Sequence, residues 1–138
     1  MATHTIEQAV RYVETDRMGV VHHSTYLFWL EVGRTSLLEA AGFPYHELEL
    51  SGTMFPVIEY SCRLVGSANY GDHVSIETSI ETLRSRTVVF KYRVLCRDKV
   101  IATASTMHIA VDRDHKPHRM ADTLIAALEP YVEPRSEV

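Results

Sequence analysis

The sequence predicts an α+β fold, in which an antiparallel sheet of about five strands wraps around one long helix. Residues 25–41 carry apolar side chains at helical spacing, and residues 57–111 contain runs that alternate between apolar and polar side chains. A first strand is expected over residues 6–13, so the helix lies between this strand and the others. A sheet that wraps around the helix buries both the apolar stripe of the helix and one sheet face.

The long helix is predicted from its end signals as well as from its stripe. Ser24 is expected to be the N-cap, and Gly42 followed by Pro44 is a stop signal. Gly33 inside the helix costs roughly 1 kcal/mol relative to alanine, which predicts close packing of this residue against the sheet. The predicted stripe consists of Tyr26, Leu30, Gly33, Leu37 and Ala41.

The second half of the chain is predicted to form an antiparallel meander that ends in a short helix. Strands are expected over residues 57–65, 74–81, 88–94 and 100–111. Turns are expected over residues 69–72 and 97–99. A closing helix is expected over residues 121–128 and a frayed tail over 133–138.

Composition limits the classes of protein to which this chain can belong. A length of 138 residues predicts one domain, and a formal net charge of −4 gives no support for nucleic-acid binding. Cys62 and Cys96 lie in strand-like patterns, which favours buried thiols over a disulfide framework. No signal peptide and no apolar run near the roughly 18 residues of a membrane span are found, so a cytoplasmic protein is expected.

The most informative segment surrounds Asp16. This aspartate precedes Gly19, a short apolar run and the predicted helix start at Ser24. A carboxylate that faces a helix N-terminus can serve acyl-group hydrolysis, because it activates the attack while backbone N–H groups receive the charge that develops on the carbonyl oxygen. The spacing fits equally well an aspartate that only shapes the turn into Gly19.

The same segment resembles the hot-dog-fold acyl-CoA thioesterases of the 4-hydroxybenzoyl-CoA thioesterase family. The resemblance covers about residues 5–125, the core of the single hot-dog domain expected over residues 1–138. Ser24 stands where the family often has asparagine, and either residue can cap a helix. The matching residues are Tyr12, Glu14, Thr15, Asp16, Gly19, Val20, Val21, His23, Ser24, Tyr26, Trp29, Glu31, Arg34, Tyr70, Gly71 and Asp72.

The resemblance implies hydrolysis of an acyl-CoA thioester to a free acid and coenzyme A. Asp16 is then the catalytic carboxylate, either as a nucleophile or as a general base, and the backbone N–H of His23 polarises the thioester carbonyl. The resemblance implies no separate cofactor, because coenzyme A is part of the substrate and water is the second reactant. The implied assembly is a homodimer or homotetramer, which would also cover the exposed sheet edges, with the active site at the subunit interface.

His22 and His23 are adjacent, so their side chains are expected to point in different directions and not to chelate a metal in the i, i+4 manner. No metal site is expected. The ring of His22 is a candidate for lining the acyl pocket or for a hydrogen bond to Asp16, and a purely structural role fits as well. His23 is expected to act through its backbone, so replacement of its side chain should be milder than replacement of Asp16.

Several other residues are candidates for substrate binding. Tyr26 and Tyr60 are candidate pocket walls, although aromatic residues at such spacing more often belong to the core, as is also expected of Trp29. The segment 55–57, including Val57, stands at a strand entry and could border the acyl chain. A basic cluster around one hairpin is either a solvated face or a binding site for the coenzyme A phosphates, with Arg86 the strongest candidate. Its members are Arg84, Arg86, Lys91 and Arg93.

Two other functions are compatible with the sequence. Asp16 and His22 could form the acid–base pair of a hot-dog enoyl-thioester hydratase, although residues 18–21 do not match the pattern expected for those enzymes. A non-catalytic acyl-CoA binding module would bind acyl-CoA without turnover.

Glu31 and Arg34, three residues apart on the helix, are expected to form an ion pair. The acyl-chain preference, the choice of coenzyme A or acyl carrier protein as carrier, and the choice of dimer or tetramer remain open.

Overall fold

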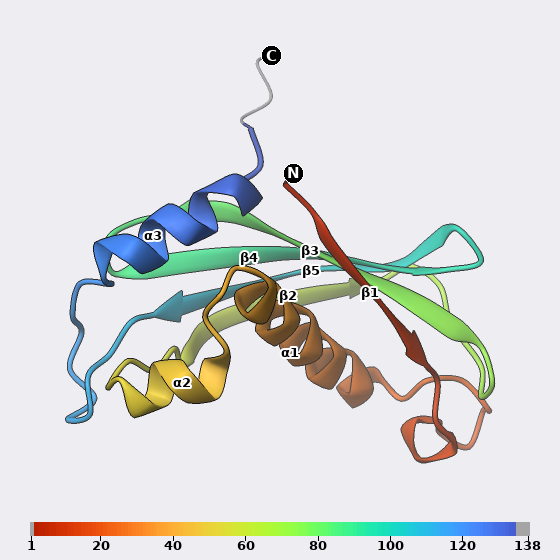
Figure 1. Ribbon diagram of the computed structural model, residues 1–138. Coiled ribbons are helices and arrows are strands. Elements are labelled where there is room, and N and C mark those ends of the chain that lie inside the picture. Colours follow the sequence, from red (N-terminus) through yellow and green to blue (C-terminus); the bar gives the residue numbers. More distant parts are fainter. Residues whose placement is uncertain (1, 135–138) are drawn as a thin grey trace.

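The computed structural model describes residues 2–134 and contains one antiparallel sheet of five strands, in the order β1-β3-β4-β5-β2 (Figure 1). Three helices and two short 3-10 helices accompany the sheet in this range, and the expected α+β fold with a five-stranded antiparallel sheet is confirmed. The strands are β1 (His4–Ala9), β2 (Val57–Leu64), β3 (His73–Leu83), β4 (Thr87–Cys96) and β5 (Lys99–Ile109).

The meander prediction is correct for β3, β4 and β5 and wrong for β2. After β2 the chain crosses to the opposite half of the sheet, where β3 pairs with β1, while β2 pairs with β5 at the other edge. Alternation shows that a segment is a strand but does not show which strand lies beside it. The first strand ends at Ala9 rather than at residue 13, because η1 (Tyr12–Glu14) follows it.

The longest helix, α1 (His23–Ala40), packs against one face of the sheet through the predicted stripe. Tyr26, Leu30 and Leu37 are buried. Gly33 makes the expected close approach to β3: a Cβ at this position would lie 2.5 Å from the Thr78 hydroxyl oxygen. Any side chain at residue 33 would therefore push the helix away from the sheet, so glycine fixes the depth at which α1 lies.

The start of α1 differs from the prediction at the cap. His22, not Ser24, is the N-cap, and its ring Nδ1 accepts a hydrogen bond from the Ser24 backbone N–H at 3.1 Å. The Ser24 hydroxyl lies 2.8 Å from the same nitrogen. Serine is the usual capping residue by type, but here the preceding imidazole supplies the acceptor, and Ser24 lies inside the first turn.

Two core clusters lie beneath α1 and divide the molecule into two ends. One cluster contains Tyr26 and Trp29 and lies near the Asp16 loop, while the other contains Leu37 and extends to the closing helix α3 (Asp122–Leu128). The short helix α2 (Tyr45–Leu50), which the sequence analysis did not predict, covers this second end. The frayed tail was predicted to begin at residue 133, but Glu133 is bound to β3: its N–H donates to the Ile80 carbonyl and its carboxylate accepts the Ser79 hydroxyl. Residues 135–138 of the predicted tail lie outside the described residues.

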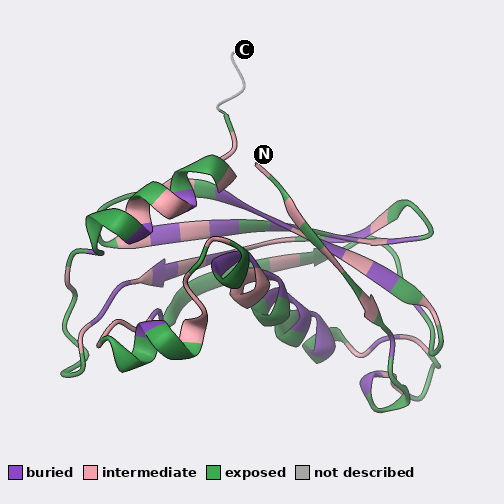
Figure 2. Cartoon of the chain, viewed as in Figure 1, coloured by how far each residue is buried: buried purple, intermediate pink, exposed green. Residues whose placement is uncertain are grey.

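Strand β2 is exposed along most of its length (Figure 2). No strand within residues 2–134 pairs with its outer edge. Apolar side chains nevertheless remain in solvent there: Ile58 is 52% exposed and Tyr60 is 58% exposed, so the core position favoured for Tyr60 is wrong. Natural edge strands are normally protected by charge or by a covering element, and no covering strand lies along this edge among the described residues.

None of the helices in the described range is long and apolar enough to cross a membrane.

Candidate active site

Asp16 lies in a tight hairpin loop that approaches the N-terminus of α1. Thr15 pairs with Val21 across the loop, and the Asp16 backbone N–H donates to the Val20 carbonyl at 2.8 Å. The Asp16 carboxylate accepts the Met18 N–H at 2.8 Å, so the turn-forming role considered from the sequence is present. Gly19 takes φ +82° and closes the turn. One carboxylate oxygen, Oδ2, has no hydrogen-bond partner among the described residues.

The N–H groups at the start of α1 are not equally available. The His22 N–H donates to the Glu14 carbonyl at 2.8 Å, and the Thr25 N–H donates to the His22 carbonyl at 2.9 Å. The Ser24 N–H donates to the His22 ring, whereas the His23 N–H has no acceptor within residues 2–134. His23 is exposed, so its N–H is the donor at this helix end that remains for a ligand oxygen.

The two histidine rings lie against each other, which contradicts the expectation that they diverge. Their centroids are 4.1 Å apart at an interplanar angle of 30°. The ring of His22 caps the helix and makes no hydrogen bond to Asp16 among the described contacts. The His22 Nδ1 is thus engaged by Ser24. In the described range no group of three or more His, Cys, Asp or Glu side chains is arranged to hold a metal ion.

Glu14 belongs to the matching motif, but its burial in this loop was not predicted from the sequence. A glutamate is expected in solvent, yet Glu14 is 5% exposed and its carboxylate accepts the Trp29 indole N–H at 3.0 Å. The signals in the sequence are its place in the matching motif and its position two residues before Asp16. Its partner Trp29 lies on the second turn of α1, a contact that short-range patterns do not reveal.

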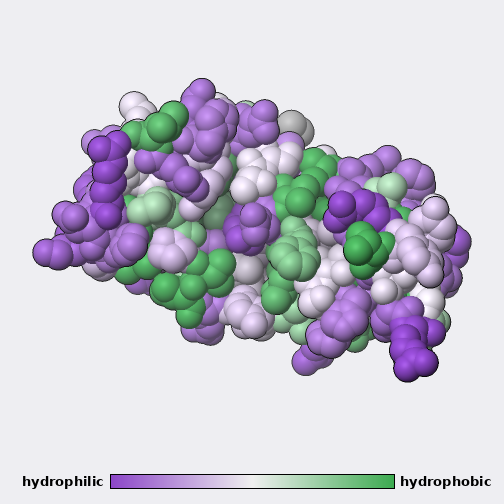
Figure 3. Space-filling view, turned by 90° about the horizontal axis from the view of Figure 1, so that it is seen from below, coloured by the Kyte–Doolittle hydropathy of each residue, from purple (hydrophilic) through white to green (hydrophobic). Residues whose placement is uncertain are grey.

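A cavity of about 280 Å³ opens at the other end of the molecule, between α1 and the strands β2, β4 and β5. Its walls are mainly apolar, and the predicted segment Phe55, Pro56 and Val57 forms one side. A shallower groove continues from it between α1 and β2 and includes Tyr60 and Phe28. Hydrophobic residues form patches on the face that carries α1 (Figure 3).

A chain of buried hydrogen bonds leads from Tyr92 to His108 and Phe55, and the last two residues line this cavity. Tyr92 bonds to Thr106 at 2.7 Å, Thr106 to the His108 Nε2 at 2.8 Å, and the His108 Nδ1 donates to the Phe55 carbonyl at 3.0 Å. A carbonyl only accepts, so the proton of neutral His108 lies on Nδ1. Burial lowers the pKa of His108 to about 4, and the ring is therefore neutral at pH 7.

The remaining predicted residues are dispersed. Tyr26 is buried against Trp29, with ring centroids 5.3 Å apart, and belongs to the core. Arg86 is exposed in the β3–β4 turn, where its carbonyl accepts the Ala110 N–H. The expected ion pair between Glu31 and Arg34 is absent from the described contacts: Arg34 instead lies close to Tyr92, and both helix residues line the cavity.

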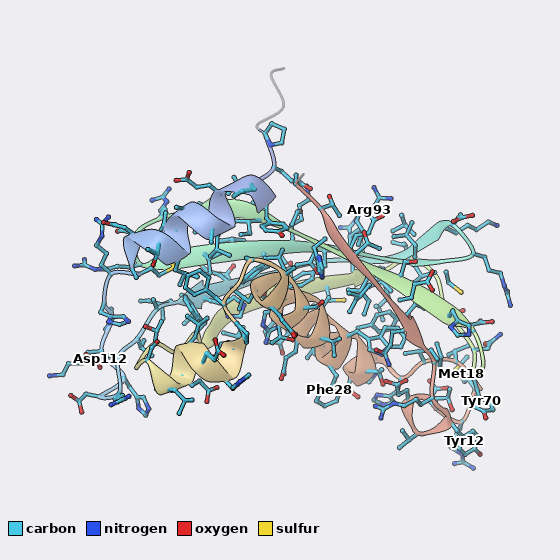
Figure 4. The ribbon with its side chains drawn as sticks, viewed as in Figure 1. Tyr12, Met18, Phe28, Tyr70, Arg93 and Asp112 are labelled. Atoms are coloured by element: carbon cyan, nitrogen blue, oxygen red, sulfur yellow. The ribbon has the colours of Figure 1, made fainter. Side chains whose placement is uncertain are left out.

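Asp16 and the cavity lie apart within one chain: the Asp16 loop adjoins the start of α1, whereas the α1 residues that line the cavity begin at Glu31. Strand β3 starts beside the Asp16 loop, since Asn69 pairs with Val20, and it ends next to the turn that carries Arg86. Its 11 residues span about 35 Å. In Figure 4, Met18 of the Asp16 loop and Asp112, which follows β5, lie at opposite ends of the molecule.

Comparison with known proteins gives the class to which this fold and loop belong. The family model of the thioesterase-like superfamily matches residues 10–128, and the chain belongs to this superfamily. The resemblance to hot-dog thioesterases is thereby confirmed.

Individual relatives agree with this assignment. The chain is 36% identical over 109 residues to the putative acyl-CoA thioesterase YneP of Bacillus subtilis, covering 78% of this chain and 79% of that protein. It is similar to the DHNA-CoA thioesterase structure from Staphylococcus aureus, with 32% identity, a TM-score of 0.83, and coverage of 86% and 81%. The 4-hydroxybenzoyl CoA thioesterase shares the fold at 18% identity, with a TM-score of 0.84 over 93% of this chain and 99% of that one.

Proposed function

We propose that the protein hydrolyses an acyl-CoA thioester to a free carboxylic acid and coenzyme A. The observation that carries the proposal is the unoccupied His23 N–H at the start of α1, beside a loop that presents the Asp16 carboxylate. A helix N-terminus with a free donor stabilises negative charge, which is what a thioester carbonyl develops when it is attacked. Membership of the thioesterase-like superfamily supports the same reaction.

The Asp16 carboxylate, the His23 N–H and water are sufficient for the complete reaction. In one route Asp16 attacks the carbonyl carbon, the thiolate of coenzyme A leaves, and water then hydrolyses the mixed anhydride. In the other route Asp16 accepts a proton from the attacking water. In both routes the oxyanion accepts the His23 N–H. The proposed reaction needs water and no dissociable cofactor, and we expect it to take place in the cytoplasm.

The second part of the proposal is a homodimer formed through β2. Its outer edge presents unpaired backbone groups and exposed apolar side chains, including Ile58 and Tyr60. Pairing with the same strand of a second copy would be isologous and antiparallel, and it would extend both sheets into one. Such pairing would satisfy the backbone groups that the isolated chain leaves open.

This dimer would bring the two distant ends together. Antiparallel pairing would set the Val57 end of one β2 beside the Leu64 end of the other. The Val57 end carries the cavity and lies near Arg86, whereas Leu64 leads through the segment 66–69 to the Asp16 loop. We therefore propose that Asp16 of one subunit serves an acyl group held in the cavity of its partner, and that Arg86 binds the coenzyme A phosphates across the interface.

A thiol-release assay on a panel of acyl-CoA substrates tests the proposal. The panel should contain short aliphatic, long aliphatic and aromatic acyl groups, each also presented on acyl carrier protein. We expect release of free thiol from at least one acyl-CoA and its loss in Asp16→Ala. Equal rates for the wild type and Asp16→Ala would exclude Asp16 as the catalytic carboxylate. Binding without turnover across the panel would identify a non-catalytic binding module.

A further inference from the structure

Glu14 is a buried acidic residue that connects the Asp16 loop to α1. It is the last residue of η1 and stands two positions before Asp16. Its side chain is 6% exposed and contacts Trp29, a member of the apolar cluster near the Asp16 loop. A buried carboxylate is costly unless hydrogen bonds and a counter-charge compensate for the lost water.

The carboxylate of Glu14 is fully engaged on both oxygens. Oε1 accepts the Arg11 backbone N–H at 2.7 Å, and Oε2 accepts the Trp29 indole N–H at 3.0 Å. The Arg11 guanidinium approaches Oε2 at 3.4 Å and supplies the opposite charge. Trp29 is itself 1% exposed, so its indole would lose its hydrogen bond if Glu14 were removed. The side chain thus links the start of the loop to the second turn of α1.

The backbone of Glu14 makes a second link to the same helix. Its carbonyl accepts the His22 N–H at 2.8 Å and the Thr25 hydroxyl at 3.2 Å. The first N–H groups of a helix have no acceptor within the helix, and the His23 N–H has none among the described contacts. Glu14 therefore holds the N-cap residue His22, directly before the residue whose N–H is free.

We propose that Glu14 is a positioning residue for thioester hydrolysis, which rests on the function proposed above. Its two links hold the hairpin that carries Asp16 in one orientation against the N-terminus of α1. With the hairpin fixed, the Asp16 carboxylate and the free His23 N–H address the same substrate carbonyl. Glu14 does not itself touch the substrate, because its carboxylate is directed into the protein toward Trp29. Small displacements of such a pair lower the rate of the chemical step more than they lower substrate binding.

The test compares Glu14→Ala and Trp29→Phe with the wild type on an acyl-CoA that the wild type hydrolyses. Trp29→Phe removes the indole donor and part of the ring volume but keeps an aromatic ring in the core, so it remains informative if Glu14→Ala does not fold. Leu124→Ala is the matched control, because it opens a core position in α3, away from the Asp16 loop. For each variant kcat, KM and the midpoint of thermal unfolding are measured, with assays run well below that midpoint.

We expect kcat to fall at least about tenfold in Glu14→Ala and Trp29→Phe, with KM changed less than about threefold. Leu124→Ala should lower the unfolding midpoint while kcat stays within about twofold of the wild type. A kcat within twofold of the wild type in folded Trp29→Phe and Glu14→Ala would overturn the proposal for Glu14 and leave the proposed function intact. An inactive wild type would instead overturn the proposed function and this proposal with it.

Discussion

The two ends of the sheet carry the same local structure with different surroundings. At one end the Asp16 carboxylate accepts the N–H of residue 18 at 2.8 Å, and at the other the Asp112 carboxylate accepts the N–H of Asp114 at 2.8 Å. Both are aspartates that shape a turn. Asp16 lies beside the start of an 18-residue helix with a free N–H donor, whereas Asp112 lies in an exposed loop.

The comparison shows that turn chemistry alone does not define a site. Asp112 also accepts the Lys116 N–H, and this hydrogen bond lowers the pKa of its carboxyl group. The Asp112 carboxylate thus accepts two backbone N–H groups where the Asp16 carboxylate accepts one, yet Asp112 faces no helix end. The far end instead offers the apolar cavity and a neutral buried His108. In the proposed mechanism the Asp16 end reacts and the cavity end holds the acyl group, and the proposed homodimer would bring the two together.

The largest expected effect separates the two aspartates. Asp16→Asn keeps a side-chain oxygen for the Met18 N–H but removes the nucleophile or base, so we expect kcat to fall by about 10²–10⁴-fold. Asp112→Asn makes the same chemical change in the same type of turn and should leave kcat unchanged. Steady-state thiol release at saturating substrate measures both. Equal losses in the two variants would show that the turn matters and the position of Asp16 does not.

The second prediction concerns the edge strand that joins the two ends. Ile58→Lys places a charge in the exposed face of β2 and should prevent edge pairing, giving a monomer with activity lowered at least about tenfold. Leu50→Lys is the control, since Leu50 is equally apolar, is 73% exposed and lies on α2 away from the edge. Sedimentation velocity and the thiol-release assay are run on the same samples. A fully active Ile58→Lys monomer would contradict a site shared between subunits.

The third prediction tests the holding end through its buried histidine. The folded-state pKa of His108 is about 4 and its ordinary value is 6.5, so between these values the unfolded chain binds a proton that the folded chain does not. Stability should therefore fall as the pH drops from 6.5 to 4, by up to about 3 kcal/mol from this group, and no further below that. Urea unfolding at a series of pH values measures the slope, which should be reduced in His108→Gln. An unchanged slope would show that His108 is not the group responsible.

The smallest effect is expected at Arg86. If this residue binds coenzyme A phosphates across the interface, Arg86→Ala should raise KM for acyl-CoA by about three- to tenfold and leave kcat unchanged. Arg113→Ala is a suitable control, because Arg113 is an exposed arginine at the same end that bonds to the Leu50 carbonyl. A truncated acyl-pantetheine substrate, which lacks the nucleotide phosphates, should show no difference between wild type and Arg86→Ala. A KM effect that persists on that substrate would count against phosphate binding.

Much of the fold could be predicted from short-range patterns. The α1 stripe, the alternation of β3 and the close approach at Gly33 follow from spacing and from the missing Cβ. The edge position of β2 could not be predicted, because strand neighbours depend on long-range pairing. Helix α2 has only six residues, too few for a periodic pattern.

The site could be predicted only where its residues are close together in the sequence. Asp16 and the helix start are local in sequence, so their juxtaposition could be anticipated. The cap at His22 was missed because residue type favours Ser24. Burial of Glu14 was missed because its partner Trp29 is 15 residues away and a charged side chain is ordinarily exposed.

Complementation between two inactive variants tests the separation of the two ends most directly. Asp16→Asn removes the reacting group, and Thr35→Trp fills the cavity, which Thr35 lines. Each homodimer should be inactive. Random mixing by co-refolding would make half of the dimers heterodimers with one intact site, so about a quarter of wild-type activity should return. If mixed dimers form and no activity returns, Asp16 and the cavity do not act together across the subunit interface.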